Sequence, residues 1–282
     1  MELAQERPEG RFFLLQFGLA LTRIALGIAY RGSAYQGWQS QVGGRTVQDH
    51  LEKALSRFAD EPISTLCAGR TDAGVHALNQ VVHFDTTRER EPIAWVRGVN
   101  RYLPPDIAVQ WSANPAESFH ARNHARSRRY AYLLLESPVR PAVESGAVGW
   151  VFRPLEEAPM VSAANALIGQ HDFSAFRASQ CQSPTPVKTL HTIHIARRGA
   201  YWRFEFEANA FLHHMVRNLM GTLLAIGQGT HPPAWAAEVL QSRSRATAAP
   251  TFSPDGLYFM GPRYDADLKL PTHTAAMDWL PA

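Results

Sequence analysis

The sequence predicts an α+β fold in which helices flank a mostly antiparallel central sheet. Segments with strand-like alternation and segments with helical periodicity follow one another without the regular spacing of βαβ units. Two strand-like segments near residue 200 are joined by Gly199 and Ala200, which is typical of a hairpin. Apolar residues make up 45% of the 282 residues, which is ordinary for a protein with a folded core.

The first half is expected to contain four strands and two helices. Thr46, with Asp49 three residues later, forms a capping-box pattern that begins a helix. Its apolar stripe is Val47, Leu51, Leu55 and Phe58. Pro92 suits the first turn of a second helix, which we expect to end near Leu103. Alternating apolar residues predict strands at 23–30, 63–67, 80–85 and 107–112.

The second half repeats this mixture. Strands are expected at 129–135, 191–196, 201–207 and 257–261, and helices at 160–168, 211–226 and 232–240. Gly169 is placed to end the first of these helices. We therefore expect an N-terminal extension of poor order (1–22), an N-terminal half that contains the loop around Asp72 (23–140), a C-terminal half of similar architecture (141–265) and a tail (266–282).

The N-terminal run RFFLLQFGLAL has the outline of a signal peptide. Three glutamates precede the run, Gln16 interrupts it, and no clean cleavage site follows. It is also too short to span a bilayer. Two cysteines, Cys67 and Cys181, cannot build a disulfide framework or a four-cysteine zinc site. We therefore expect a cytoplasmic protein with no membrane association and with reduced thiols.

Arginine dominates the basic side chains. Only three of the 28 lysines and arginines are lysines, and the sequence pI is about 9.0. Genomic base composition can produce such a bias. Arginine also grips phosphates bidentately and stacks on bases, so the bias permits a nucleic-acid partner.

A glycine-bounded loop, CAGRTDAGVHA, lies between two expected strands and places Asp72 two residues after Arg70. An ionised carboxylate beside a guanidinium is a poor general acid but suits nucleophilic attack or stabilisation of a developing cation. Glycines allow sharp turns and a close approach to a ligand. From spacing alone, a structural Arg–Asp pair that braces a turn explains the pattern as well.

The segment FHARNHARSRRYAY, residues 119–132, interleaves basic and aromatic side chains. Such a mixture suits a nucleic acid whose phosphates pair with arginine and whose bases stack on rings. The alternative is a solvated basic strand with Tyr130 and Tyr132 in the core, since both tyrosines lie on one strand face.

Nothing in the sequence predicts a metal or a cofactor. His213 and His214 are adjacent on an expected helix, where neighbours point about 100° apart, so they do not form the i, i+4 pair of a helical metal site. We interpret them as structural or ligand-contacting, not as metal-binding. The glycines of GSAYQGW match neither dinucleotide nor P-loop patterns.

Taken together, these stretches resemble the TruA-type tRNA pseudouridine synthases. YRGSAYQGWQSQ, AGRTDAGVHA, FHAR…RRYAY, DFSAFRASQCQSPT and NAFLHHMVRN follow the order and approximate spacing of that family's motifs. The resemblance covers about residues 23–262, and the loop motif is highly specific. It implies the pseudouridine synthase fold and the isomerisation of uridine to pseudouridine without a metal, nucleotide or redox cofactor.

The resemblance also implies roles for individual residues. Asp72 matches the catalytic aspartate, which acts as a nucleophile or as a base. Arg70 matches the residue that pairs with the aspartate and helps to expel the target uridine. Tyr130 matches the tyrosine that packs on the flipped base, where its hydroxyl is a candidate for relaying the C5 proton. Leu257 falls where the family has an apolar residue on the uracil.

The implied partners are the anticodon arm of tRNA, modified at uridines 38, 39 and 40, and a second copy of the chain in a homodimer. The expected tRNA contacts are Arg90, Phe119, His120, Ala121, Arg122, Asn123, Gln180, Cys181, Gln182, Ser183 and Pro184. Departures from the family pattern at Arg31, Asn123, His124 and Pro184 concern tRNA contacts. The alternatives are a non-catalytic RNA-binding protein on the same scaffold and a related synthase that acts on another RNA.

Overall fold

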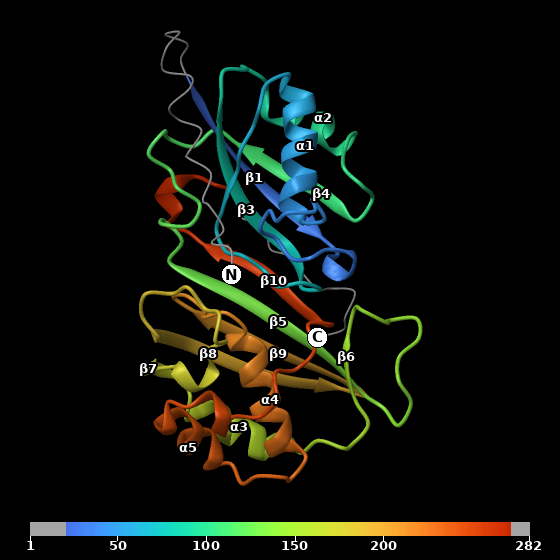
Figure 1. Cartoon of the computed structure of the whole chain (residues 1–282), viewed down its shortest axis with the longest axis vertical. Helices are drawn as coiled ribbons and strands as arrows, with labels where there is room; N and C mark the ends of the chain where they lie inside the picture. Colours follow the sequence, from blue (N-terminus) through green and yellow to red (C-terminus); the bar gives the residue numbers. More distant parts are fainter. Residues whose placement is uncertain (1–20, 272–282) are drawn as a thin grey trace.

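A computed structural model describes residues 21–271 and is built around one large sheet (Figure 1). The strand order is β4-β1-β3-β10-β5-β9-β8-β7, with β2 beside β3 and β6 beside β5. Only the β10–β3 and β5–β6 pairs are parallel, so the sheet is mostly antiparallel, as predicted. The strands are β1 (Thr22–Tyr30), β2 (Leu66–Cys67), β3 (His76–Thr86), β4 (Ile107–Ala113), β5 (Ser127–Glu136), β6 (Gly149–Val151), β7 (Gly169–Asp172), β8 (Val187–Arg198), β9 (Tyr201–Ala208) and β10 (Leu257–Arg263).

Five α-helices cover the sheet in two groups (Figure 1). They are α1 (Val47–Ala59) and α2 (Pro92–Asn100) in the first group, and α3 (Glu157–Asn165), α4 (Met215–Gly227) and α5 (Trp235–Ser242) in the second. Short 3₁₀ helices lie at Gly32–Ala34, Ser174–Phe176, Arg245–Thr247 and Ala266–Leu268. Each group of helices buries its own apolar core against the sheet.

The central strand β10 brings the two cores together. Phe259 of β10 belongs to the core beneath α1 and α2, whereas Leu257, two residues earlier on the same face, belongs to the core beneath α3 to α5. Phe259 pairs in register with Ala77 of β3 and with Tyr130 of β5. Tyr130 packs against both cores, so this tyrosine lies at their junction.

Several predicted elements are confirmed in place and type. The Thr46 side chain accepts a hydrogen bond from the backbone N–H of Asp49, as the capping-box pattern predicts. The hairpin of β8 and β9 turns at Gly199, which adopts a φ of +57°. The strands predicted at 23–30, 107–112, 129–135 and 257–261 correspond to β1, β4, β5 and β10.

Other boundaries were wrong. The helix predicted to begin at Phe211 begins at Met215, because His214 adopts a left-handed conformation with a φ of +61°. The strand predicted over 63–67 has only two residues, and β3 begins at His76 rather than Gln80. The helix predicted over 160–168 lies three residues earlier, at Glu157–Asn165.

The predicted N-terminal extension (1–22) lies outside the described residues except for 21–22, and the predicted tail (266–282) lies outside them except for 266–271. Within residues 21–271, no helix is both long and apolar enough to span a membrane.

Candidate active site

The candidate catalytic loop, residues 68–75, connects β2 to β3 and rests on the segment that follows β1. The backbone N–H of Trp38 donates to the carbonyl of Thr71 at 3.0 Å. The hydroxyls of Tyr30 and Thr71 share a buried hydrogen bond of 2.7 Å. The N–H of Val75 donates back to the carbonyl of Asp72 at 3.2 Å and closes a turn. Hydrogen bonds to Thr71 and to the carbonyl of Asp72 therefore fix the backbone on both sides of the Asp72 side chain.

Gly37 makes the close fit between these two segments possible. It has a φ of +89°, and a Cβ at this position would lie 2.7 Å from the Thr71 carbonyl oxygen. A side chain would both strain the backbone and push the loop away. Gly37 thus allows residues 36–38 to pack closely against the loop of residues 68–75.

The start of the loop is fixed by a half-buried guanidinium. Arg128 donates to the carbonyl of Ala68 from Nε and Nη2, at 3.3 and 3.1 Å. The same side chain also donates to the carbonyls of Arg122, Ala125 and Asn209. Arg128 thus links the catalytic loop to two other motif segments. The sequence grouped this residue with the RNA-facing arginines, but its donors point at protein carbonyls.

Three nitrogen-bearing side chains surround the Asp72 carboxylate. His213 Nε2 lies 3.4 Å from Oδ1, and His214 Nε2 lies 3.5 Å from Oδ2. Arg217 Nη1 lies 3.4 Å from Oδ2, and its Nε donates to the Phe252 carbonyl at 2.8 Å. The Asp72 side chain is 21% exposed, so a ligand can still reach the carboxylate.

These neighbours determine the protonation of Asp72. Burial alone would raise the pKa of the carboxyl group, but the hydrogen bond from His213 and the charges of His214 and Arg217 outweigh burial and hold the pKa below its usual range. Asp72 is therefore ionised at neutral pH. The pKa of His213 is raised chiefly by its hydrogen bond to Asp72, whereas burial lowers the pKa of His214.

The expected pairing of Arg70 with Asp72 is not present. Arg70 is exposed, and the ion pairs of Asp72 within residues 21–271 are those with His213, His214 and Arg217. Asp72 turns toward α4, and its compensating charges come from a segment about 140 residues away in sequence. Arg70 is left free to contact a ligand outside the loop.

The left-handed residue before α4 explains how two adjacent histidines reach one carboxylate. His213 and His214 precede the helix rather than lie on it, and their ring centroids are 4.0 Å apart. The backbone N–H of His213 donates to Cys181 Sγ at 3.4 Å, which places the 180–184 segment beside the site. The prediction that both histidines lie on a helix with their rings about 100° apart was therefore wrong. Asp72, His213 and His214 are the one group of three potential metal ligands within residues 21–271.

Tyr130 presents its ring to the same region. The centroid of the ring lies 5.1 Å from that of Phe211 and 5.0 Å from that of Phe259. Burial, followed by the nearby charge of Asp72, raises the pKa of Tyr130, so its hydroxyl stays protonated at neutral pH. Three aromatic rings and one ionised carboxylate thus converge where the two cores meet.

The expected RNA-contacting segment 119–123 divides into buried and exposed residues. Phe119 and Ala121 are fully buried, and their carbonyls accept from Arg23 and Tyr264. These two residues therefore anchor the segment and offer no side chain to RNA, which corrects the sequence-based interpretation. Side chains available for a ligand come from the other three residues, His120, Arg122 and Asn123.

The second expected segment, residues 180–184, is organised by Arg177. Its Nη2 donates to the carbonyls of Cys181 and Ser183, at 2.6 and 3.0 Å. Gln180, Gln182 and Pro184 are exposed, whereas Cys181 and Ser183 are half-buried. This segment presents a polar rim next to His213.

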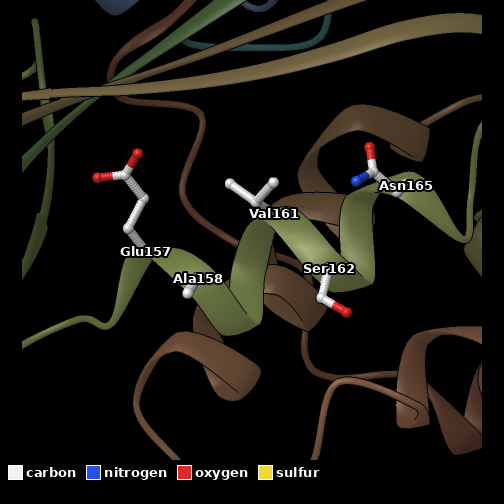
Figure 2. A pocket seen from close by; sticks show the side chains of 5 residues that line it. All are labelled: Glu157, Ala158, Val161, Ser162 and Asn165. Atoms are coloured by element: carbon white, nitrogen blue, oxygen red, sulfur yellow. The ribbon is translucent and has the colours of Figure 1, made fainter.

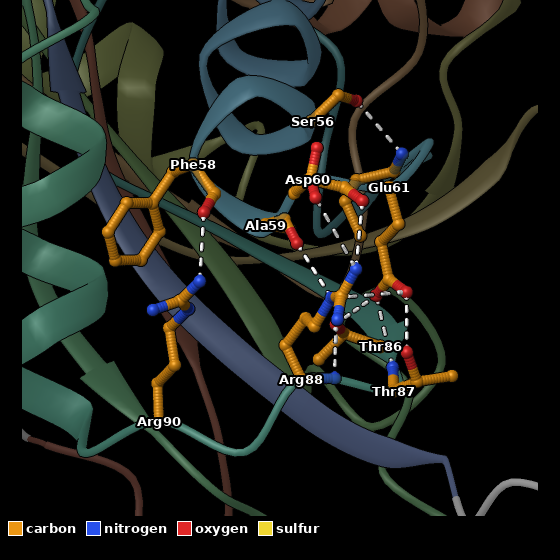
Figure 3. Close-up of polar contacts among 10 residues, drawn as sticks. Ser56, Phe58, Ala59, Asp60, Glu61, Thr86, Thr87, Arg88 and Arg90 are labelled. Carbon is orange, nitrogen blue, oxygen red and sulfur yellow. Dashed lines mark hydrogen bonds and ion pairs between the residues drawn. The ribbon is translucent and has the colours of Figure 1, made fainter.

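Of the two remaining expected substrate contacts, Arg90 lies away from this centre and Leu257 is buried next to it. Arg90 follows the end of β3 that is remote from the loop, and its guanidinium stacks 4.5 Å over the Phe58 ring and donates to the Phe58 carbonyl (Figure 3). The neighbouring Arg88 pairs with Asp60 and Glu61 (Figure 3). Leu257 is 3% exposed and belongs to the core beneath α3 to α5, against which Tyr130 and Phe211 pack. Its side chain therefore supports these rings from within the core.

An open hollow beside α3 does not compete with this site. It is lined by Glu157, Ala158, Val161, Ser162 and Asn165, all from one helix (Figure 2). Among these lining residues Glu157 is the only titratable one, and the other polar side chains are Ser162 and Asn165.

Comparison with known proteins identifies the family of the chain. The sequence profile of a family described as tRNA pseudouridine synthase matches residues 27–122 and 163–265, which include Asp72, His213 and Arg217. The chain belongs to this family.

Relatives named tRNA pseudouridine synthase A match 92% of the chain over their full length. They come from Methylibium petroleiphilum at 71% identity, Polaromonas naphthalenivorans at 65% and Paracidovorax citrulli at 62%. A solved Cbf5–Nop10–Gar1 complex matches 71% of this chain and 54% of its own at 10% identity, with a TM-score of 0.32, which is too low to support an argument.

Asp72 and Tyr130 could be singled out from the sequence, but their neighbours in the fold could not. Arg217 lies in the quoted NAFLHHMVRN motif, yet only the fold shows that it faces Asp72. Phe259 reaches Tyr130 from a strand that is distant in sequence. As a family member, the chain is an isomerase, and its best-supported chemical centre is an ionised carboxylate in a partly open aromatic site.

Proposed function

We propose that the protein converts uridine to pseudouridine at positions 38, 39 and 40 in the anticodon arm of tRNA, with Asp72 as the catalytic group. The observation that carries this proposal is the Asp72 carboxylate, which is held ionised by His213, His214 and Arg217 and remains partly exposed beside Tyr130. A protein that only binds RNA has no need for a carboxylate held in this way.

The chemistry requires an anion. The C1′–N1 glycosidic bond breaks, the uracil rotates, and C5 bonds to C1′, after which the C5 proton is lost and N1 gains a proton. Asp72 either attacks the substrate as a nucleophile or removes a ribose proton to give a glycal, and both routes use the ionised form. No atom is added to the base overall, so the reaction needs no redox or nucleotide cofactor.

The target base must leave the helical stack to reach Asp72, which costs a few kcal/mol. We propose that the exposed Arg70 occupies the space that the base leaves, and that Tyr130 packs on the flipped uracil. His120, Arg122, Asn123 and the 180–184 segment supply polar and basic contacts around this entrance. We further propose that the protein is a cytoplasmic homodimer with one tRNA across both subunits, as in the family it resembles.

The direct test is to incubate the purified protein with unmodified tRNA and to map pseudouridine at each position. We expect modification at 38, 39 and 40 wherever these are uridines. Modification at other sites alone would show a synthase with a different RNA substrate. Tight tRNA binding without any pseudouridine would leave an RNA-binding role and contradict the proposal.

A further inference from the structure

The arrangement of Asp72, His213 and His214 has a property that pseudouridine formation does not require. Their ligand atoms lie within 4.8 Å of one another and belong to two imidazoles and one carboxylate. Two histidines and a carboxylate, with an open fourth position, are a ligand set used by zinc enzymes.

We propose that these three residues form a binding site for a divalent transition-metal ion such as Zn²⁺, and that the bound ion inhibits the enzyme. The site is distinct from a cofactor site, because the metal would occupy the carboxylate that the reaction needs free. A metal would thus act as a reversible inhibitor of the same centre.

The distances fit this interpretation. Zinc bonds of about 2.0–2.1 Å in a tetrahedral arrangement place neighbouring ligand atoms about 3.4 Å apart. His213 Nε2 lies 3.4 Å from one carboxylate oxygen of Asp72, and His214 Nε2 lies 3.5 Å from the other. Both rings direct Nε2 toward the carboxylate, each to a different oxygen, so one ion can bind after the three side chains close from within 4.8 Å of one another to this spacing.

The site is also accessible. The side chains of His213, His214 and Asp72 are 36%, 30% and 21% exposed, so an ion can enter from solvent and keep a water ligand. Arg217 opposes binding, because its Nη1 lies 3.4 Å from Asp72 Oδ2 and would face a second cation. We therefore expect weaker affinity than at a closed structural zinc site.

The test uses Co²⁺ as a spectroscopic probe for zinc, titrated into the RNA-free protein. We expect one Co²⁺ per chain, with the d–d absorption of a low-coordinate site that Zn²⁺ displaces. His213→Ala and His214→Ala should each weaken Co²⁺ binding at least about tenfold, and Asp72→Asn should do the same. Two controls should bind as the unaltered protein does: His191→Ala, an exposed histidine on β8, and Cys181→Ser, which removes the nearest thiol.

Activity provides the second readout. Zn²⁺ should inhibit pseudouridine formation over the concentration range in which it displaces Co²⁺, and a chelator should restore the rate. Mg²⁺ should not inhibit, because it prefers oxygen ligands. The proposal is overturned if Co²⁺ does not bind at one ion per chain, or if a variant with both His213→Ala and His214→Ala binds Co²⁺ as the unaltered protein does. It is also overturned if Cys181→Ser alone abolishes Co²⁺ binding. Because the titration needs no RNA, its outcome does not depend on the proposed function.

Discussion

Asp72 differs from an ordinary surface carboxylate because one short segment, residues 213–217, supplies the two imidazoles and the guanidinium that contact it within residues 21–271. Burial favours protonation of a carboxyl group, and here the neighbouring imidazoles and guanidinium more than offset that tendency. The carboxylate is anionic before a substrate arrives. A preorganised anion costs nothing further at the moment of reaction.

The hydroxyl of Tyr130 can be separated experimentally from its ring. Tyr130→Phe keeps the contacts with Phe211 and Phe259, so tRNA binding should stay nearly normal. The hydroxyl is protonated at neutral pH, so we expect it to relay the C5 proton: its oxygen accepts that proton while its own O–H proton passes to solvent. Its loss should slow the single-turnover rate by about 10²–10⁴.

Tyr130→Leu serves as the comparison, since it removes the ring as well and should also weaken binding by a stacking contribution of ~1–3 kcal/mol. A Tyr130→Phe rate within about threefold of the unaltered protein would restrict this residue to packing.

At the scale of elements, the loop of 68–75 depends on the segment that packs beneath it. Gly37→Ala should strongly reduce the rate of pseudouridine formation, because the new Cβ would clash with the Thr71 carbonyl and displace Asp72. Gly44→Ala is the matched control: this glycine also has a positive φ, but its Cβ would meet nothing within 4 Å.

Both substitutions carry the strain of a left-handed alanine, roughly 1–2 kcal/mol, and both should lower the melting temperature. Of the two folded variants, only Gly37→Ala should form pseudouridine more slowly than the unaltered protein. Equal activities of the two variants, measured at a temperature where both are folded, would refute a positioning role for Gly37.

Arg128 joins three segments through one guanidinium. Arg128→Lys keeps the charge but loses the planar five-donor fork, so the carbonyls of Ala68, Arg122 and Asn209 cannot all be satisfied. We expect a lower kcat with a smaller change in tRNA affinity. Arg126→Lys is the control, since Arg126 is exposed and pairs only with Asp265. A loss of tRNA affinity alone in Arg128→Lys would indicate a phosphate contact instead.

The sequence predicts local elements well where short-range chemistry decides them. The capping pattern at Thr46 and the turn at Gly199 are both local, and both are confirmed. The start of α4 was wrong because an apolar run continues through Phe211 and Leu212, and nothing nearby in sequence indicates that His214 adopts a left-handed conformation.

The partners of the site residues were harder to predict than the residues themselves. Arg70 is the nearest cation to Asp72 in sequence, yet Arg217 is the one that contacts it in space. Strand order causes this difference, because β10 inserts between β3 and β5 and brings both halves to one junction. The alternation of apolar residues predicts that residues 257–261 form a strand, but it does not predict that this strand pairs in parallel with β3.

For the whole molecule, two buried histidines predict acid sensitivity. The Nδ1 atoms of His76 and His83 accept hydrogen bonds from the backbone N–H groups of Gly32 and Ala121, which requires neutral rings. Burial lowers the pKa of each to about 4, from an ordinary value of 6.5. Below pH 6.5 the folded state binds fewer protons at these histidines than the unfolded state does. Their contribution to the free energy of unfolding is therefore complete above pH 6.5 and is lost as the pH falls toward 4, at ~1.4 kcal/mol per pH unit for each histidine.

Urea unfolding between pH 7 and pH 4 measures this effect. His83→Gln can still accept from Ala121 but cannot titrate, so its free energy of unfolding should depend less on pH over this range. His194→Gln, at an exposed position of β8, should leave the slope unchanged. Identical slopes in all three proteins would show that His83 does not contribute to acid sensitivity.

The proposed function depends above all on the Asp72 carboxylate, which we expect to perform the isomerisation. Pseudouridine formation releases the C5 hydrogen, so tritium released from tRNA labelled at C5 of uridine measures the reaction directly. Asp72→Asn keeps the size of the side chain but removes its charge. Under single-turnover conditions with saturating enzyme, we expect tritium release from the unaltered protein and none above background from Asp72→Asn, with tRNA binding nearly unchanged. Release by Asp72→Asn at even about a tenth of the unaltered rate would contradict the claim, because a neutral amide can act neither as a nucleophile nor as a base.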